Sequence, residues 1–311
     1  MIIHRGYDSF KAKNPVITLG IFDGVHAGHR MLIDILKRKA RQLDGESVIF
    51  TFDPHPRQVL SKDDKKLRFL TGPEEKTVLL GRCGVDHLVI IPFDEEFSRM
   101  DACEFMENVL VAKAGARYLI TGYNHHFGKG GEGDYETVRS CAEKHGLTVE
   151  KVAPVLVDDI PVSSTSIREA LMSGNLDLAN RLLGYRYFIQ GSIVSGKKIG
   201  RELGFPTANV NPGFKSKLIP RNGVYAVFAT VDNVRYPAVM SIGLNPTVTS
   251  ENTDPVIEVH ILGFDRDIYG LGISVELCAR LRDEIRFGSL PELSHQIELD
   301  RKKASEILSR L

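Results

Sequence analysis

The ten-residue string GIFDGVHAGH, residues 20–29, carries side chains suited to phosphate chemistry. It follows an apolar run and precedes a helical pattern, and the start of a helix offers free backbone N–H groups and a favourable dipole to a phosphate. His26 and His29 are three residues apart at this helix start, so they project the same way. Such a pair can donate hydrogen bonds to phosphate oxygens as charge develops on them. The candidate binding residues beside the pair are Gly20, Phe22, Asp23 and Gly24. The alternative is a glycine-rich turn with two exposed histidines.

A second candidate site is GKKIGRELGFPTAN, residues 196–209. Its glycines and basic residues predict a loop that closes over a polyphosphate, although the Walker pattern GxxxxGK[ST] is absent. Thr207 and Asn209 supply neutral oxygens suited to magnesium, and their spacing puts them on one face of an extended strand. The other candidate binding residues of this string are Gly196, Lys197, Gly200, Arg201, Gly204, Phe205 and Pro206. The alternative is a simple strand start.

Glu258 is the only carboxylate within the apolar run Val256–Leu262, and it shares a strand face with His260. A carboxylate in this position can accept the proton of a substrate hydroxyl. A strand glutamate that faces solvent is the alternative.

Hydroxyl side chains also cluster at a predicted helix start. Ser164 and Thr165, with Arg168 one turn further on, offer hydrogen bonds and a fixed positive charge to a polyphosphate. The alternative is a capping box formed by Ser166 and Glu169.

The first half of the chain must position the histidine site. Short apolar runs with strand character alternate with segments of helical spacing, which favours a parallel sheet wound with helices. The predicted strands are Val16–Ile21, Ser47–Phe52, His87–Pro92 and Arg117–Thr121, and the predicted helices are Arg30–Leu43, Pro73–Arg82, Glu95–Ala114 and Tyr135–His145. Two short helices close this half, the second with Asn175 as N-cap and Gly184 after its end.

Beyond Gly184 the pattern changes to strands without intervening helices, which is typical of an antiparallel barrel or sandwich. These strands are Tyr187–Val194, Val224–Val231, Val234–Ile242, Val256–Leu262 and Ile273–Leu281, followed by a terminal amphipathic helix within Pro291–Leu311. Asp232 and Asn233 form a two-residue turn. The predicted domains are residues 1–183 and 184–311.

Length and charge agree with this division. A chain of 311 residues predicts two domains, since one domain takes about 100–200 residues. Forty basic and forty acidic residues give zero net charge, which argues against nucleic acid or a membrane surface as partner. The four cysteines are widely spaced and indicate reduced thiols, and without a signal segment or long apolar run we expect a cytoplasmic protein.

The motifs resemble, in order, those of the bacterial bifunctional riboflavin kinase/FMN adenylyltransferase (FAD synthetase) family. GIFDGVHAGH, TFDPHP at residues 51–56 and SSTSIR at 163–168 look like its adenylyltransferase module. GYNHHFG at 122–128 resembles its flavin and nucleotide loop, with Asn124 at the polar position. Residues 196–209 resemble the riboflavin kinase signature GRxLGFPTAN nearly residue for residue. The resemblance covers about residues 16–300.

The resemblance implies a Rossmann-like nucleotidyltransferase domain that adenylylates FMN to FAD with release of pyrophosphate. It also implies a barrel domain that phosphorylates riboflavin to FMN, with ATP and Mg²⁺, and in which Glu258 is the catalytic base. Riboflavin, FMN and ATP are then the small-molecule partners, and a homo-oligomer stays open. Two alternatives are a nucleotidyltransferase for another phosphorylated substrate, and a flavin-binding regulatory protein whose adenylylation site has decayed.

Overall fold

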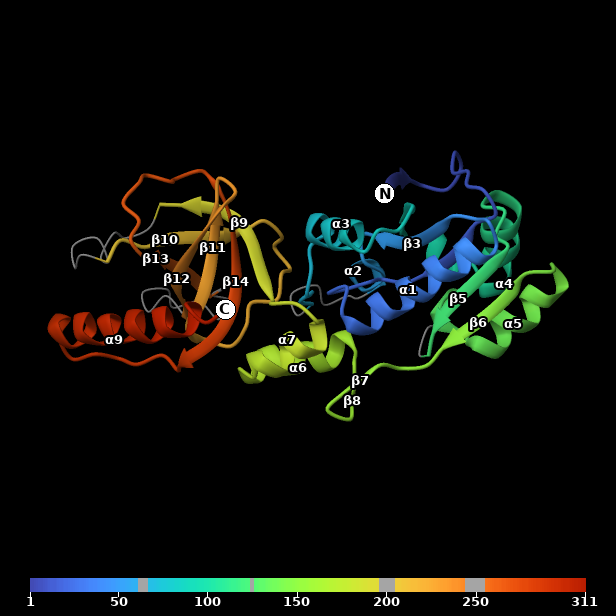
Figure 1. Ribbon diagram of the computed structural model, residues 1–311. Helices are drawn as coiled ribbons and strands as arrows, with labels where there is room; N and C mark the ends of the chain where they lie inside the picture. The colour runs from blue at the N-terminus through green and yellow to red at the C-terminus, as the bar shows by residue number, and fades with distance from the viewer. Residues whose placement is uncertain (61–66, 124–125, 196–204, 244–254) are drawn as a thin grey trace. The chain divides into compact units, whose positions relative to one another are not determined.

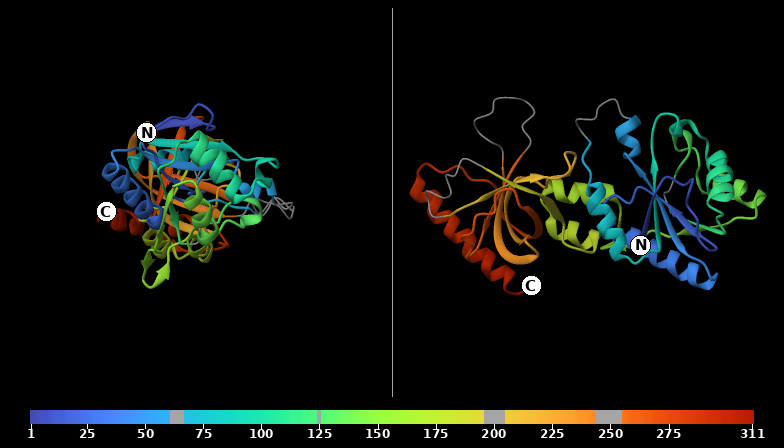
Figure 2. Two further views of the ribbon diagram at one scale, coloured as in Figure 1. Left: turned by 90° about the vertical axis from the view of Figure 1, so that its right-hand side faces the viewer. Right: turned by 90° about the horizontal axis from the view of Figure 1, so that it is seen from above.

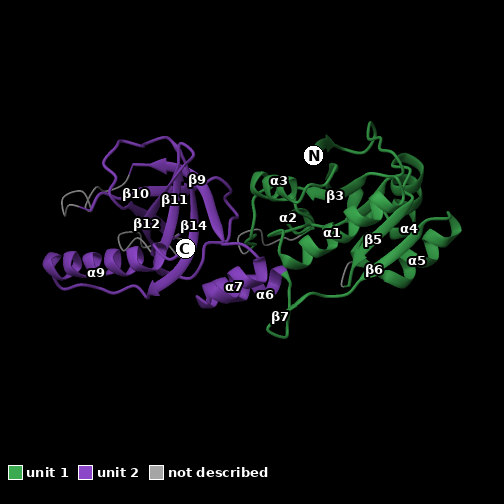
Figure 3. Ribbon diagram, viewed as in Figure 1, with its two compact units in different colours: residues 1–163 green, residues 164–311 purple. Residues whose placement is uncertain are grey.

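The computed structural model describes residues 1–60, 67–123, 126–195, 205–243 and 255–311 (Figure 1). The chain divides into two compact units, residues 1–163 and residues 164–311 (Figure 3). Each unit has its own sheet.

The first unit is built on a six-stranded sheet in which every neighbouring pair is parallel. Its strands are β1 (Ile2–Arg5), β2 (Val16–Leu19), β3 (Ser47–Asp53), β4 (His87–Pro92), β5 (Tyr118–Gly122) and β6 (Thr148–Val152), in the order β1-β4-β3-β2-β5-β6. The predicted parallel sheet is confirmed. The two edge strands, β1 and β6, were not anticipated from the sequence.

Helices cover both faces of this sheet. Ile17, Leu19 and Phe50 point into a core shared with Phe105 and Leu110, so the alternate strand residues face the opposite side, where α1 packs. The helices are α1 (Ala27–Gln42), α2 (Pro56–Leu60), α3 (Pro73–Arg82), α4 (Ala102–Phe105) and α5 (Tyr135–Lys144), and a small hairpin, β7 (Leu156–Val157) and β8 (Ile160–Pro161), ends the unit.

The helix predicted over Glu95–Ala114 is interrupted. A 3₁₀ turn at Phe97–Arg99 is followed by Asp101, whose carboxylate accepts a hydrogen bond from the Glu104 N–H at 2.8 Å and so caps α4. From Met106 to Lys113 the helix continues in π geometry. The N-cap at Asp101 therefore divides the helix that the sequence pattern predicts as continuous.

The expectation of four reduced thiols is wrong for two of them. Cys103 on α4 and Cys141 on α5 form a disulfide, with Cα atoms 5.6 Å apart. Cys83 and Cys278 are free. The bonded pair is 38 residues apart in the chain, and spacing alone does not reveal connectivity.

The second unit begins with α6 (Ser164–Ser173) and α7 (Leu176–Leu183). As predicted, the Asn175 side chain caps α7 by accepting from the Leu178 N–H, and Gly184 ends it in the left-handed conformation, with φ 75°.

A closed barrel of six antiparallel strands follows, which decides between the predicted barrel and sandwich. Its order is β10-β13-β12-β11-β14-β9, with β9 Phe188–Val194, β10 Ala208–Pro212, β11 Gly223–Val231, β12 Val234–Gly243, β13 Val256–Ile261 and β14 Gly272–Arg282. Asp232 and Asn233 form the predicted two-residue turn, both with positive φ.

The terminal helix α9 (Leu290–Leu308) runs along the outside of the barrel (Figure 2). Ala304 and Leu308 of α9 are buried against Val224, Ala226 and Leu281 of the strands. The predicted amphipathic helix is confirmed, and it covers one part of the outer barrel face.

Candidate active sites

The histidine pair of the first unit lies at the start of α1. His26 is the N-cap residue, and its Nδ1 accepts a hydrogen bond from the His29 N–H at 3.3 Å. The two imidazole rings stack with centroids 3.6 Å apart and planes 16° apart. The structure thus brings both side chains together at a helix N-terminus. Because Nδ1 of His26 is an acceptor, its Nε2 is the nitrogen that can donate to a ligand.

Phe22 supports this pair from the core. Its side chain is only 1 % exposed, and its ring centroid lies 4.9 Å from that of His29. A Cβ on Gly20 would lie 2.9 Å from the Phe22 ring, so a larger residue at position 20 would displace it. Gly20 is therefore required for the packing beneath His29.

Asp23 and Gly24 are tied to the segment before α3. The Asp23 carboxylate accepts from the Thr71 N–H at 3.0 Å and from the Thr71 hydroxyl at 3.3 Å. The Gly24 N–H donates to the same hydroxyl at 3.0 Å. Asp23 is 5 % exposed, so its charge is satisfied inside the protein.

Lys76 of α3 joins the turn to the neighbouring strand. Its Nζ donates to the carbonyl oxygen of Ile21 at 3.3 Å and to the hydroxyl of Thr51 at 3.2 Å. Neither Thr71 nor Lys76 was singled out from the sequence. The available signal was their position at the start of a predicted helix that follows a parallel strand, which is where ligands bind in such sheets.

The hydroxyl cluster lies at the start of α6, in the second unit. The helix begins at Ser164, so Ser166 lies inside its first turn rather than at the N-cap, and the capping box of Ser166 and Glu169 is wrong. Ser164 and Thr165 occupy the first turn, and Arg168 follows on the same helix. A polyphosphate role for these residues stays a prediction.

The kinase candidates meet on the barrel. Asn209 of β10 lies directly opposite Glu258 of β13, and Glu258 lies opposite Ser241 of β12. Their strand neighbours Ala208 and Val259 are buried, so the row Asn209, Glu258, Ser241 faces outward. Side chains paired in this way have Cβ atoms about 4.5–5.5 Å apart. The register therefore juxtaposes a candidate magnesium ligand with the candidate base.

The surroundings of Glu258 alter its chemistry. Burial raises the pKa of its carboxyl above the ordinary value, because a partly desolvated site disfavours the charged form. A carboxylate with a raised pKa binds a proton more readily than an ordinary glutamate, as a base must.

His260 anchors the residues before Thr207. Burial lowers the pKa of its imidazole, so the ring is neutral at pH 7, and Nδ1 lies 2.8 Å from the Pro206 carbonyl oxygen, to which its N–H donates. The Phe205 ring meets the imidazole edge to face, with centroids 5.9 Å apart. The sequence placed His260 only on the face of Glu258, without this role.

A pocket of about 280 Å³ is lined by residues of the opposite, inward-facing row, among them Ala208 and Val259. Pro206 and Thr207 form part of its wall. The apolar part of the rest comes from β9, β13 and the following loop: Ile193, Val259, Ile261, Phe264 and Ile268. The same loop also contributes the charged residues Asp265, Arg266 and Asp267. Thr207 thus lines the pocket and lies two residues before Asn209 of the outward row.

Six predicted site residues lie outside the described residues: Asn124, Gly196, Lys197, Gly200, Arg201 and Gly204. Their assignment rests on the sequence alone.

Comparison with known proteins identifies the family to which each part of the chain is similar. The family model described as FAD synthetase matches residues 9–166, and the one described as riboflavin kinase matches residues 183–308. A Bacillus subtilis protein named bifunctional riboflavin kinase/FMN adenylyltransferase is 36% identical over 299 residues, covering 95% of this chain and 93% of its own. The Escherichia coli K12 protein of the same name is 36% identical over 94% of this chain and 92% of its own. The chain belongs to this family.

Membership in the bifunctional riboflavin kinase/FMN adenylyltransferase family confirms the predicted function, an enzyme of flavin cofactor synthesis with both activities. A solved structure titled macrolide-efflux protein from Streptococcus pneumoniae is also similar, with a TM-score of 0.88, 29% identity and coverage of 97% of this chain and 98% of its own. Among the residues described for this chain, no helix is both long and apolar enough to cross a bilayer.

The raised pKa of Glu258 predicts the pH dependence of the riboflavin kinase reaction. A base must be deprotonated, so kcat should fall as the pH drops through the pKa of this carboxyl, with a midpoint above the ordinary 4.5. The measurement is kcat for riboflavin phosphorylation across the acid range. A limb centred at or below 4.5 would contradict the assignment.

Proposed function

We propose that Glu258 is the general base of the kinase reaction and that Thr207 and Asn209 hold magnesium and the nucleotide phosphates. The observation that supports this best is the direct pairing of Asn209 with Glu258 across β10 and β13. A base beside the metal and phosphate site can take the proton of the riboflavin 5′-hydroxyl as that oxygen attacks the γ-phosphate of ATP. The Glu258→Gln variant described in the Discussion tests this proposal.

The residues on the barrel fit magnesium. Mg²⁺ prefers hard oxygen ligands and binds through a few protein oxygens together with substrate phosphates and water. The hydroxyl of Thr207 and the amide oxygen of Asn209 are such ligands. Within the described ranges no cluster of three or more His, Cys, Asp or Glu side chains could cage a metal, which agrees with an ion held mainly by ATP. When bound, it would neutralise charge on the transferring phosphate.

The pocket lined by Pro206 and Thr207 would take the base of ATP. At about 280 Å³ it lies just below the roughly 300–1,000 Å³ typical of ligand pockets, which suits one part of a nucleotide. Its apolar wall favours an aromatic ring. Thr207 would then lie between the adenine base and the phosphates of ATP.

For adenylylation, the FMN phosphate attacks the α-phosphorus of ATP and pyrophosphate leaves. His26 and His29 stabilise charge on the transferring phosphate, with backbone N–H groups at the start of α1. Their stacked rings at a helix N-terminus support this role. Gly20, Phe22, Asp23 and Gly24 shape the turn, and Asn124, Ser164, Thr165 and Arg168 are assigned to flavin and nucleotide binding.

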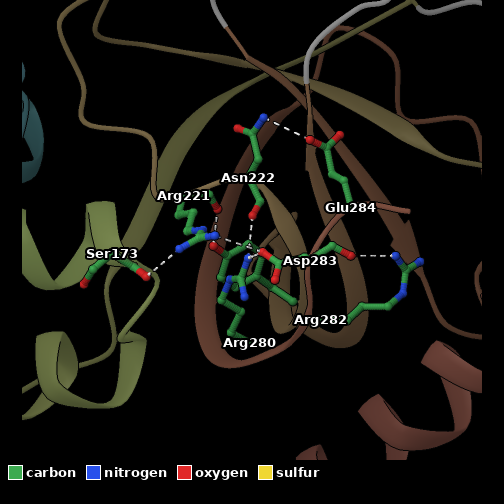
Figure 4. Close-up of polar contacts among 8 residues, drawn as sticks. Ser173, Arg221, Asn222, Arg280, Arg282, Asp283 and Glu284 are labelled. Carbon is green, nitrogen blue, oxygen red and sulfur yellow. Dashed lines mark hydrogen bonds and ion pairs between the residues drawn. The ribbon is translucent and has the colours of Figure 1, made fainter. Parts of the chain in front are cut away.

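The two activities divide at residues 183/184 in this proposal. The matched family models leave residues 167–182 between them, whereas α6 and α7 belong to the compact unit of the barrel. Figure 4 shows one attachment, in which Arg221 donates to the Ser173 carbonyl oxygen at 3.3 Å. Asn180 of α7 also donates to the Leu277 carbonyl oxygen and accepts from the Tyr187 N–H.

These contacts predict how fragments behave. Residues 184–311 should make FMN, because they contain the whole kinase motif set. Residues 164–311 should make FMN too and should unfold at a higher temperature, because they keep the bonds of Arg221 and Asn180. The comparison is kinase activity and thermal unfolding of both fragments. A folded 184–311 fragment without kinase activity would refute the division at 183/184.

Family membership supports riboflavin, FMN and ATP as partners. Zero net charge argues against nucleic acid or a membrane surface as a partner. We propose that the enzyme is cytoplasmic.

A further inference from the structure

The turn that carries the histidine pair has an unusual backbone. Phe22 has φ 53°, Gly24 has φ 82° and Val25 has φ 37°. Glycine adopts such angles freely, but a phenylalanine and above all a β-branched valine do not. Backbone of this kind persists only where the surroundings hold it.

Core packing holds part of the turn. Phe22 and Val25 are almost completely buried, which fixes their side chains. The polar backbone and the carboxylate of the turn need other partners, because buried polar groups must be hydrogen-bonded.

One short segment, Thr71 to Lys76, supplies several of those partners. The Thr71 hydroxyl accepts from the Gly24 N–H and donates to Asp23, and the Thr71 N–H also donates to Asp23. Lys76 donates to the Ile21 carbonyl oxygen. These hydrogen bonds therefore contact the turn at Ile21, Asp23 and Gly24, all of which precede His26.

The charged form of Lys76 is disfavoured by burial. Burial lowers the pKa of its ammonium group, and the nearby carboxylates of Asp23 and Asp53 oppose that shift without cancelling it. A desolvated charge often stabilises a fold less than an apolar side chain of similar size would.

We propose that Thr71 and Lys76 are positioning residues of the adenylyl transfer site, which hold the strained turn so that His26 and His29 meet the transferring phosphate. The inference rests on the proposed role of the two histidines. Lys76 reaches both the Ile21 carbonyl and Thr51 of β3, so it fixes the turn relative to the end of the neighbouring strand.

The test uses the full-length protein with FMN and ATP as substrates. Lys76→Met, which keeps the length of the side chain, should lower kcat for FAD formation by roughly 10–100-fold, the scale of a small misplacement of catalytic groups. The KM values should change little, since the groups affected act in the transition state. The temperature of unfolding should not fall, because a desolvated charge has been removed.

A second pair of variants tests Thr71. Thr71→Val loses the hydroxyl and should lower kcat in the same way, whereas Thr71→Ser keeps the hydroxyl and should retain most of the kcat that Thr71→Val loses. Thr77→Val is the matched control, because among the described residues the Thr77 hydroxyl bonds only to Pro73 of its own helix. It should leave FAD formation unchanged.

Two results would overturn the inference. One is normal kcat in Lys76→Met. The other is a loss of activity that follows a lower unfolding temperature and disappears when the assay is cooled, which indicates a purely structural role. His29→Ala is measured in parallel. If only Lys76→Met keeps full activity, this inference fails; if His29→Ala keeps it as well, the proposed role of the histidines fails too.

Discussion

Replacing Glu258 with glutamine should lower kcat for riboflavin phosphorylation by about 10²–10⁴-fold, the usual contribution of a general base. Glutamine keeps the shape of the side chain and its place opposite Asn209 in the strand register, but it cannot accept the proton of the 5′-hydroxyl. ATP binding should persist, because Thr207 and Asn209 are intact. The effect should therefore lie in kcat rather than in the KM for ATP.

Two controls separate catalysis from damage to the fold. FAD formation from supplied FMN should stay near the unmodified rate, because the histidine site lies in the other unit. Glu276→Gln makes the same change on β14, at a carboxylate that pairs with Arg235 on the barrel surface, and should phosphorylate riboflavin normally. Loss of both activities in Glu258→Gln would mean that folding is damaged or that the two sites are coupled. A normal rate of riboflavin phosphorylation would refute the assignment of Glu258 as the general base.

The pKa of Glu258 also predicts the direction in which this variant changes the free energy of unfolding. The pKa of Glu258 is raised in the folded protein, so its favourable contribution is complete below the unfolded pKa and is lost as the pH rises through the folded pKa. At pH 7 the buried charge thus opposes folding. Glu258→Gln should leave the free energy of unfolding at pH 7 unchanged or raise it.

Replacing His29 with alanine should lower FAD formation from FMN by roughly 10²–10³-fold, the scale for one lost transition-state donor. The change removes one of the two stacked imidazoles and leaves Phe22 without its ring contact. The His29 backbone N–H, which donates to His26, is retained. The start of α1 should therefore keep its cap.

His145→Ala is the matched control for this variant, because His145 lies at the end of α5, where it faces Glu107. It should synthesise FAD normally, and both variants should phosphorylate riboflavin at the unmodified rate. The readout is the rate of FAD formation from FMN at saturating ATP. Unchanged FAD synthesis in His29→Ala would remove the histidine from the mechanism.

The sequence predicts the elements that carry local signals. His87–Pro92 and Pro73–Arg82 have the predicted bounds, because a buried run and a proline at a helix start mark them clearly. β1 and β6 lie at the sheet edges and are partly exposed, so they lack a continuous apolar run. They join the sheet through pairing with β4 and β5, which no local pattern reveals.

The candidate sites follow the same division. His26, His29 and Glu258 stand out by residue type within short motifs. Thr71 and Lys76 do not, because their partners lie 48 and 55 residues away in the chain. The same holds for the Cys103–Cys141 disulfide and for the pairing of Asn209 with Glu258. Long-range contacts are set by the tertiary fold, so spacing in the sequence cannot supply them.

The most direct test of two separate sites is to supply riboflavin, ATP and magnesium to Glu258→Gln, to His29→Ala and to their mixture, and then to separate the flavins by chromatography. Glu258→Gln alone should leave riboflavin largely unchanged, and His29→Ala alone should accumulate FMN. The mixture should form FAD, because one variant makes the FMN that the other adenylylates. FAD formation by either variant alone at the unmodified rate, or a mixture that stops at FMN, would contradict the assignment of the two activities to these residues.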